Sequence, residues 1–165
     1  MTILKKLLFT LFIPVLFLNN LNAEKINDKA ALNGIKEAKS VFLIDFTNVR
    51  KTAFYLNIIE GTHKGLIKQG VKPKMVLVFI GETVKFLSTK QDEAFEMEHE
   101  EHLEAIQNSI KNLSKAGVRM EVCAVATKVF KVDNNTIPKE MNIIADGFIS
   151  LIGWQTQDYK LVPIF

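Results

Sequence analysis

The sequence has one cysteine among its 165 residues, and it is also poor in glycine, proline and net charge. One thiol excludes a disulfide within the chain, and it excludes the multi-cysteine sites that hold structural zinc or iron–sulfur clusters. Eight glycines and four prolines are too few for a low-complexity linker protein. The 21 basic and 18 acidic residues leave a formal charge of +3, so we expect no nucleic-acid partner. The apolar content of 48% is instead typical of a globular domain.

The first 23 residues differ from the rest of the chain. Lys5 and Lys6 precede an apolar run over residues 7–18, and Ala23 stands before a polar stretch. This order is typical of a secretory signal peptide, although a retained N-terminal membrane anchor is the alternative. The run is shorter than the about 20 residues that span a bilayer. We therefore expect cleavage after Ala23, a periplasmic or secreted protein that meets the membrane only through an uncleaved signal segment, and one domain over residues 24–165.

Short apolar runs alternate with helical patterns in that domain. We expect strands over residues 41–44, 75–80, 118–125, 141–145 and 159–164, helices over 49–70, 91–116 and 146–157, and a helical turn over 126–132. Apolar strands that alternate with helices imply a parallel sheet covered on both faces. The sequence therefore predicts an α/β fold in three layers, α/β/α, around a five-stranded, mainly parallel sheet of flavodoxin-like type. In the last helix we expect Phe148, Leu151 and Ile152 to face inward.

Cys123 is the first candidate for chemistry. It falls at or near the end of the third expected strand, and ligands of parallel sheets gather beyond such strand ends. A helix that starts just after a thiol points N–H groups at it, and these favour the nucleophilic thiolate. The alternative is a buried apolar filler among Val122, Ala124 and Val125, because free cysteine is one of the most buried residue types.

Other polar residues give weaker signals. Asp45 ends the first strand and is either a general base or a cap for the next helix. His99 and His102 share a helix face and could hold a metal, or they belong to a solvated charged face. Trp154, with Phe148, lines a small pocket or packs in the core.

Two segments resemble the DsrE/DsrF-like family of sulfur-relay proteins, in particular an exported branch of it. They are residues 117–127, where a Gly-Val-x-x-x-Val lead ends at the strand-end Cys123, and residues 145–155, which continue to residues 159–163. The resemblance spans about residues 38–165. It implies a DsrE-like α/β/α fold and a homo-oligomer.

The resemblance also implies a function, in which the strand-end cysteine carries sulfane sulfur as a persulfide between a donor and an acceptor. That role falls on Cys123, with no metal or organic cofactor. We expect the backbone N–H groups of Ala124 and Thr127 to stabilise the thiolate, Trp154 to wall the pocket, and Glu82 to lie at a neighbouring strand end. The partners would be sulfur donor and acceptor proteins or small sulfur species. The alternative function is a non-catalytic oligomeric binding or assembly module in which the cysteine is structural.

Overall fold

The computed structural model describes residues 26–164, so the expected signal peptide over residues 1–23 lies outside the described residues. Five strands form one sheet in the order β4-β3-β2-β1-β5, and every neighbouring pair is parallel. The strands are β1 (Glu37–Ile44), β2 (Lys72–Phe79), β3 (Arg119–Cys123), β4 (Asn142–Ile144) and β5 (Lys160–Val162). The α/β class and the five-stranded parallel sheet predicted from the sequence are confirmed.

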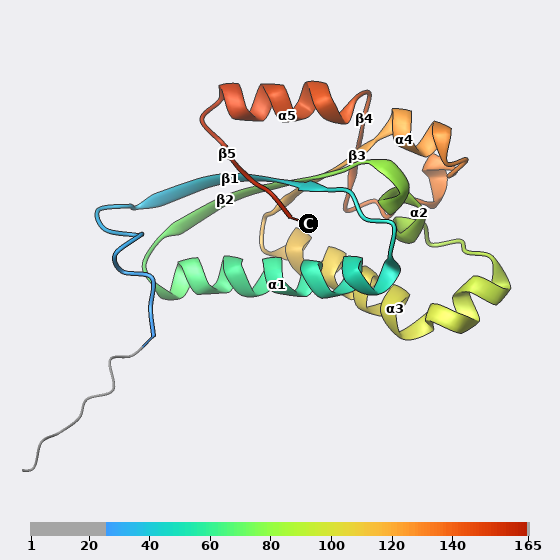
Figure 1. The fold of residues 1–165 in the computed structure, drawn as a ribbon, viewed down its shortest axis with the longest axis horizontal. Coiled ribbons are helices and arrows are strands. Elements are labelled where there is room, and N and C mark those ends of the chain that lie inside the picture. The colour runs from blue at the N-terminus through green and yellow to red at the C-terminus, as the bar shows by residue number, and fades with distance from the viewer. Residues whose placement is uncertain (1–25, 165) are drawn as a thin grey trace, which may run out of the picture.

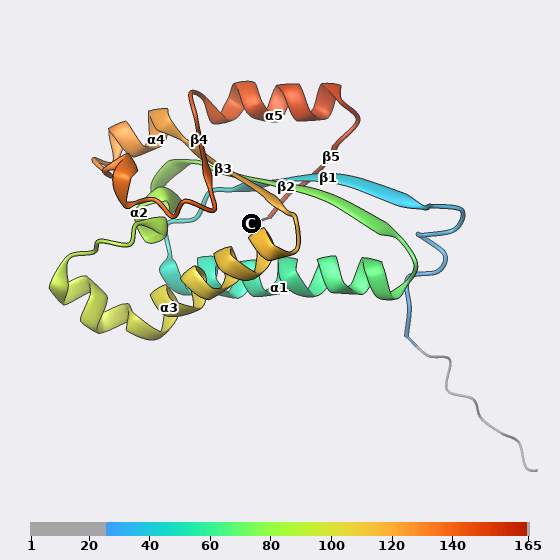
Figure 2. The ribbon, with the colours of Figure 1, turned by 180° about the vertical axis from the view of Figure 1, so that it is seen from behind.

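Helices cover both faces of this sheet, which gives the three predicted layers. The two long helices α1 and α3 lie on one face and α5 lies on the other, as Figure 1 and the opposite view in Figure 2 show. The helices are α1 (Val49–Lys68), α2 (Val84–Leu87), α3 (Glu93–Lys115), α4 (Ala124–Val129) and α5 (Gly147–Thr156), with 3₁₀ turns η1 (Gly81–Thr83) and η2 (Asn134–Thr136). No helix among residues 26–164 combines the length and the apolar character that crossing a bilayer requires.

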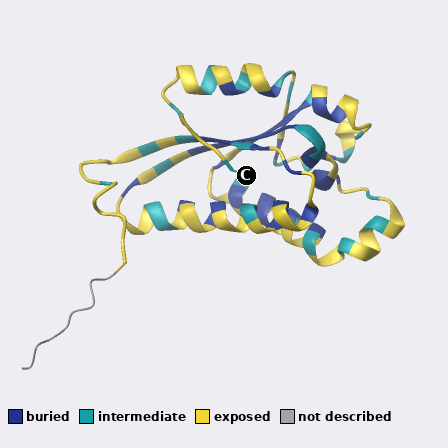
Figure 3. Ribbon diagram, viewed as in Figure 1, coloured by how far each residue is buried: buried dark blue, intermediate teal, exposed yellow. Residues whose placement is uncertain are grey.

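The core lies on both sides of the central strand β2. Residues 75–79 of β2 are at most 4% exposed, because β1 and β3 pair with its edges and helices cover its faces. Figure 3 shows the buried residues concentrated in the strands and in the inner sides of α1 and α3. A strand with apolar side chains on both faces must be covered on both faces, as in the middle of a parallel sheet. The run Met75–Ile80 could therefore be recognised in the sequence as a buried strand.

Local boundaries differ from the sequence prediction at several elements, among them β1, β3 and α4. β1 begins at Glu37, four residues before the expected apolar run, because its first half pairs with β2 while its side chains stay largely exposed. β3 stops at Cys123, and α4 follows at once from Ala124. The expected strand over 118–125 therefore ends earlier, and the helical turn over 126–132 starts earlier.

Helix α5 corrects the expectation about which of its residues face the core. Leu151 is buried, as predicted, but Phe148 and Ile152 are 64% and 65% exposed, so their predicted inward orientation is wrong. Only one side of a helix can face the sheet, and here Gly147, Leu151 and the half-buried Trp154 occupy that side. The outer side of α5 is consequently apolar and uncovered in this single chain.

Candidate functional site

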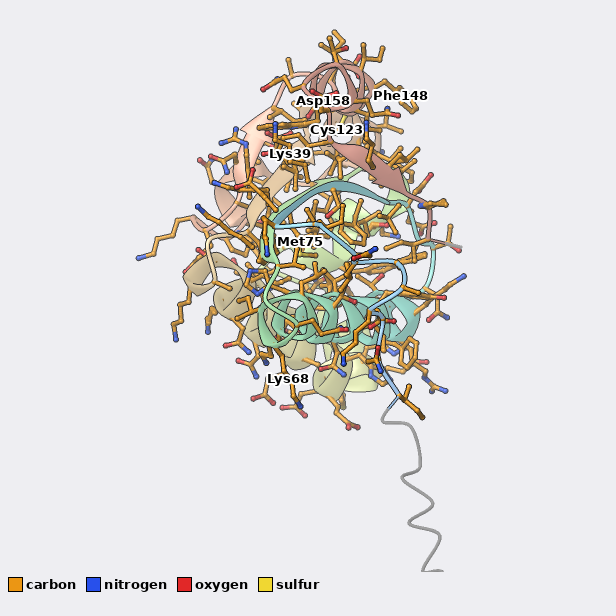
Figure 4. The ribbon with its side chains drawn as sticks, turned by 90° about the vertical axis from the view of Figure 1, so that its left-hand side faces the viewer. Lys39, Lys68, Met75, Cys123, Phe148 and Asp158 are labelled. Carbon is orange, nitrogen blue, oxygen red and sulfur yellow. The ribbon has the colours of Figure 1, made fainter. Side chains whose placement is uncertain are left out.

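The carboxyl ends of the strands meet at one edge of the sheet, because the strands are parallel. At this edge β3 ends at Cys123, and α5 begins at Gly147 after the turn that follows β4. The Gly147 N–H donates a hydrogen bond to the Cys123 sulfur over 3.2 Å, and the cysteine is 5% exposed. Figure 4 shows Cys123 between the sheet and α5, with Phe148 on the helix side. The thiol therefore faces the N-terminus of the helix that follows the next strand.

Asp146 and Gly147 together arrange the N-terminus of α5 around the sulfur. The Asp146 carboxylate caps the helix by accepting from the N–H groups of Phe148 over 2.8 Å and Ile149 over 3.4 Å. The N–H of Gly147 is left for the Cys123 sulfur. An N–H at a helix N-terminus carries a share of the helix dipole and stabilises negative charge on an acceptor. Gly147 is thus a backbone donor at the N-terminus of α5 that points at the Cys123 sulfur.

Glycine at position 147 is required by close approach rather than by backbone conformation. A Cβ built there would overlap the Ile80 side chain and would lie 3.3 Å from Cβ of Cys123 and 3.5 Å from Cγ1 of Val78. The absence of a side chain lets α5 lie against β2 and β3 closely enough for the hydrogen bond to sulfur.

A cavity of about 290 Å³ opens beside the thiol. Its wall is mostly apolar, and the residues that line it are Asp45, Ile80, Gly81, Cys123, Val125, Ala126, Val129, Phe130, Asp146 and Phe148. The lining combines loops after β1 and β2 with the short helix α4 and the start of α5.

Asp45 is held at this cavity by the loop that follows β1. The next residue, Phe46, is fixed through Thr83, whose hydroxyl accepts from the Phe46 N–H and donates to the Phe46 carbonyl over 2.9 Å. Thr83 is fully buried, so these two bonds tie the loop after β1 to the loop after β2. The helix cap that was the alternative role for Asp45 is supplied by Asn48, which accepts from the N–H of Lys51.

Two of the residues predicted to support the thiolate lie next to it in the chain but outside the cavity lining. Cys123 is the N-cap residue of α4, and the Thr127 hydroxyl donates to the Ala124 carbonyl over 3.1 Å. Thr127 is buried within this short helix. Within residues 26–164, the backbone N–H that reaches the sulfur is that of Gly147.

Glu82 and Trp154 also lie outside the lining of the cavity. Glu82 sits in η1 after β2, at the predicted strand end, and forms an ion pair with Lys85 at 2.9 Å. The Trp154 indole lies in the second half of α5 and donates to the Glu121 carboxylate over 3.1 Å. Trp154 therefore contacts Glu121, two residues before Cys123 on β3, and is not among the residues that line the cavity.

Glu121 is a residue of this region that the sequence analysis missed. Its carboxylate is 3% exposed and accepts from Ser150, from the Trp154 indole and from Arg119. Glu121 and Cys123 are two apart on β3 and therefore point to the same face of the sheet, toward α5. A glutamate inside the apolar strand, two residues before the cysteine, was the available signal. This network fixes the helix whose first N–H reaches the sulfur.

The histidine pair on α3 is arranged differently from a metal site. The helix is kinked at His99, whose ring packs edge-on against Phe95. Nε2 of His102 accepts from Nε of Arg50 over 3.3 Å. In the part of the chain that the structure describes, no group of three or more His, Cys, Asp or Glu side chains is placed to bind one metal ion.

Comparison with known proteins now identifies the family. The model of the DsrE/DsrF-like family matches residues 39–164. The chain belongs to the DsrE/DsrF-like family. The match covers β1 from residue 39 and the other four strands in full. It includes Cys123 and agrees with the resemblance noted in residues 117–127 and 145–155. A search of curated proteins found no match.

Several solved structures resemble the fold of this chain. A protein of unknown function from Methanobacterium thermoautotrophicum is 13% identical, with a TM-score of 0.57 over 78% of this chain and 99% of its own. The ychN protein from E. coli is also 13% identical, with a TM-score of 0.56 over 77% and 99% of the two chains. A conserved protein of unknown function from Bacteroides thetaiotaomicron is 16% identical, with a TM-score of 0.53 over 76% and 95%. Likeness at this identity shows a shared fold.

Proposed function

We propose that this DsrE/DsrF-like protein carries sulfane sulfur as a persulfide on Cys123. Family membership suggests sulfur relay, and the observation that carries the proposal is the thiol at the end of β3 beside an open cavity. Cys123 is the single cysteine of the chain, so the sulfur would arrive from and leave to another molecule.

The proposed reaction is an exchange without net oxidation. The Cys123 thiolate attacks the outer sulfur of a persulfide donor, R–S–SH, and forms a new S–S bond. The donor's S–S bond breaks, and the donor leaves as a thiol, R–SH, with the proton that Cys123 gave up. An acceptor thiol then attacks the outer sulfur and restores Cys123. Stabilisation of negative charge by the Gly147 N–H supports both the attacking thiolate and the returning one.

We also propose that the protein acts outside the cytoplasm, because residues 1–23 have the pattern of a signal peptide. Its donor and acceptor would then be periplasmic or secreted molecules. Homo-oligomerisation belongs to the same proposal. It is supported by the uncharged α5, on whose outer side Phe148, Ile149 and Ile152 are 64–68% exposed. Apolar surface of this kind is typical of contacts between subunits.

The test is the intact mass of the protein after incubation with sodium polysulfide and, separately, with 2-hydroxyethyl persulfide, a donor whose organic substituent carries no charge. Wild type should gain one or more sulfur atoms that a reductant removes, and Cys123→Ser should gain none. An added thiol should then remove the gained sulfur and restore the original mass. Wild type that gains no sulfur from either donor would refute the proposal.

A second candidate function is a non-catalytic binding or assembly module. The observation that favours it is the 5% exposure of Cys123, together with the uncovered apolar side of α5. Titration with a small thiol reagent separates the two functions. The module predicts a thiol that is protected until the protein unfolds, whereas the persulfide carrier predicts a thiol that reacts in the native protein.

A further inference from the structure

The cavity beside Cys123 has an uneven charge. Asp45 and Asp146 are its two acidic members, and none of its lining residues is basic. The remaining wall is apolar apart from the thiol itself and the backbone of Gly81. A sulfur compound that approaches Cys123 therefore passes two carboxylates and meets no cationic side chain in the cavity wall.

Neither carboxylate is neutralised by a neighbouring side chain. Among residues 26–164, no Lys, Arg or His forms an ion pair with Asp45 or Asp146. Asp146 accepts two backbone N–H groups at the start of α5. Glu82, the acid at the neighbouring strand end, is different, because Lys85 pairs with it at 2.9 Å. The negative potential at the cavity thus comes from the two aspartates.

Sulfur donors and acceptors differ in charge, so the two carboxylates should change the rates at which they react with Cys123. Thiosulfate and sulfite are anions, hydroxyalkyl thiols are neutral, and amino-thiols of the cysteamine type are cations. A unit charge about 6 Å from a carboxylate at an effective dielectric of about 40 changes a rate about tenfold. Water at the exposed Asp45 reduces this effect, and salt screens it.

We propose that the Cys123 cavity selects cationic and neutral thiols and persulfides as its sulfur donors and acceptors, and disfavours small anionic sulfur compounds such as thiosulfate and sulfite. This inference rests on the proposed function, because sulfur donors and acceptors matter only if Cys123 carries sulfur. The charge preference itself belongs to the cavity and acts on any reagent that reaches the thiol.

The test uses three symmetrical disulfides that differ in charge: cystamine, bis(2-hydroxyethyl) disulfide and 3,3′-dithiodipropionate. In each reaction the Cys123 thiolate attacks one sulfur, the reagent's S–S bond breaks, and one thiolate leaves, so intact mass follows the mixed disulfide. The same three rates on a short unstructured cysteine peptide correct for the different leaving groups. The corrected ratio of the cystamine rate to the dithiodipropionate rate should be about ten to a hundred at low salt, and it should fall as salt is added.

Two variants test whether Asp45 causes the charge preference. Asp45→Asn should lower the corrected ratio severalfold, because it removes one of the two charges and keeps the size of the side chain. Asp158→Asn is the matched control, since Asp158 lies just beyond the other end of α5 and is 84% exposed. The control should keep the wild-type ratio.

The outcomes separate this inference from the proposed function. A corrected ratio near one in wild type overturns the inference, whether or not a persulfide forms. A high ratio that Asp45→Asn lowers supports the inference, even where no persulfide forms and the proposed function fails. A thiol that reacts with none of the three reagents in the native protein overturns both.

Discussion

Replacement of Gly147 by alanine tests the packing that brings α5 to the sulfur. The added Cβ would overlap the Ile80 side chain and press on Cβ of Cys123 at 3.3 Å. Inserting a methyl group into a packed interior costs about 1–3 kcal/mol. The helix preference of alanine over glycine offsets at most about 1 kcal/mol of this. We therefore expect a net loss of about 1–2 kcal/mol in the free energy of unfolding.

The same substitution should slow chemistry at the thiol. Relief of the overlap moves the start of α5 away from β3 and lengthens the 3.2 Å hydrogen bond from the Gly147 N–H to the sulfur. A hydrogen bond to a charged group contributes about 1.5–3 kcal/mol, and part of its loss is recovered because a less stabilised thiolate is a stronger nucleophile. The rate of mixed-disulfide formation with bis(2-hydroxyethyl) disulfide should fall about three- to tenfold.

Gly153→Ala provides the matched control in the same helix. A Cβ at Gly153 would have no atom within 4 Å, so alanine there should be neutral or stabilise by up to about 1 kcal/mol. Chemical denaturation of both variants measures the difference, and the reagent rate follows reactivity. If Gly147→Ala proves as stable as Gly153→Ala and reacts at the wild-type rate, the close approach of α5 to β2 and β3 is refuted.

Three further substitutions test other contacts. Glu121→Ala should lower the free energy of unfolding by about 2–4 kcal/mol in a denaturant titration, because it leaves the half-buried donors of Ser150 and Trp154, and the exposed Arg119, without their shared acceptor; a loss below about 1 kcal/mol would contradict the network. Thr83→Val keeps the shape but leaves the Phe46 N–H and carbonyl unpaired, and thermal melting should show a loss of about 2–4 kcal/mol; an unchanged midpoint would exclude this tie between the two loops. Ile152→Lys should reduce the oligomer mass in light scattering without lowering stability, since Ile152 is 65% exposed; an unchanged mass would show that subunits meet elsewhere.

Much of the fold could be predicted because its signals are local. The apolar run over residues 75–80 identifies the central strand without any knowledge of its neighbours, since a strand covered on both faces needs apolar side chains at successive positions. The outward side of α5 was predicted wrongly for the opposite reason. Phe148 and Ile152 are as apolar as core residues, and the pattern of a uniformly apolar helix does not say which side meets the sheet.

The candidate site divides in the same way. The sequence alone determined that one thiol, Cys123, stands at the end of an apolar strand and that Asp146-Gly147 begins a later helix, because strand ends and helix caps are properties of a few adjacent residues. Only the tertiary structure decided that the Gly147 N–H reaches a sulfur 24 residues earlier, and that Asp45 joins Asp146 at the same cavity. Parallel pairing of β1, β2, β3 and β4 brings these distant strand ends to one edge, and no local pattern encodes that order.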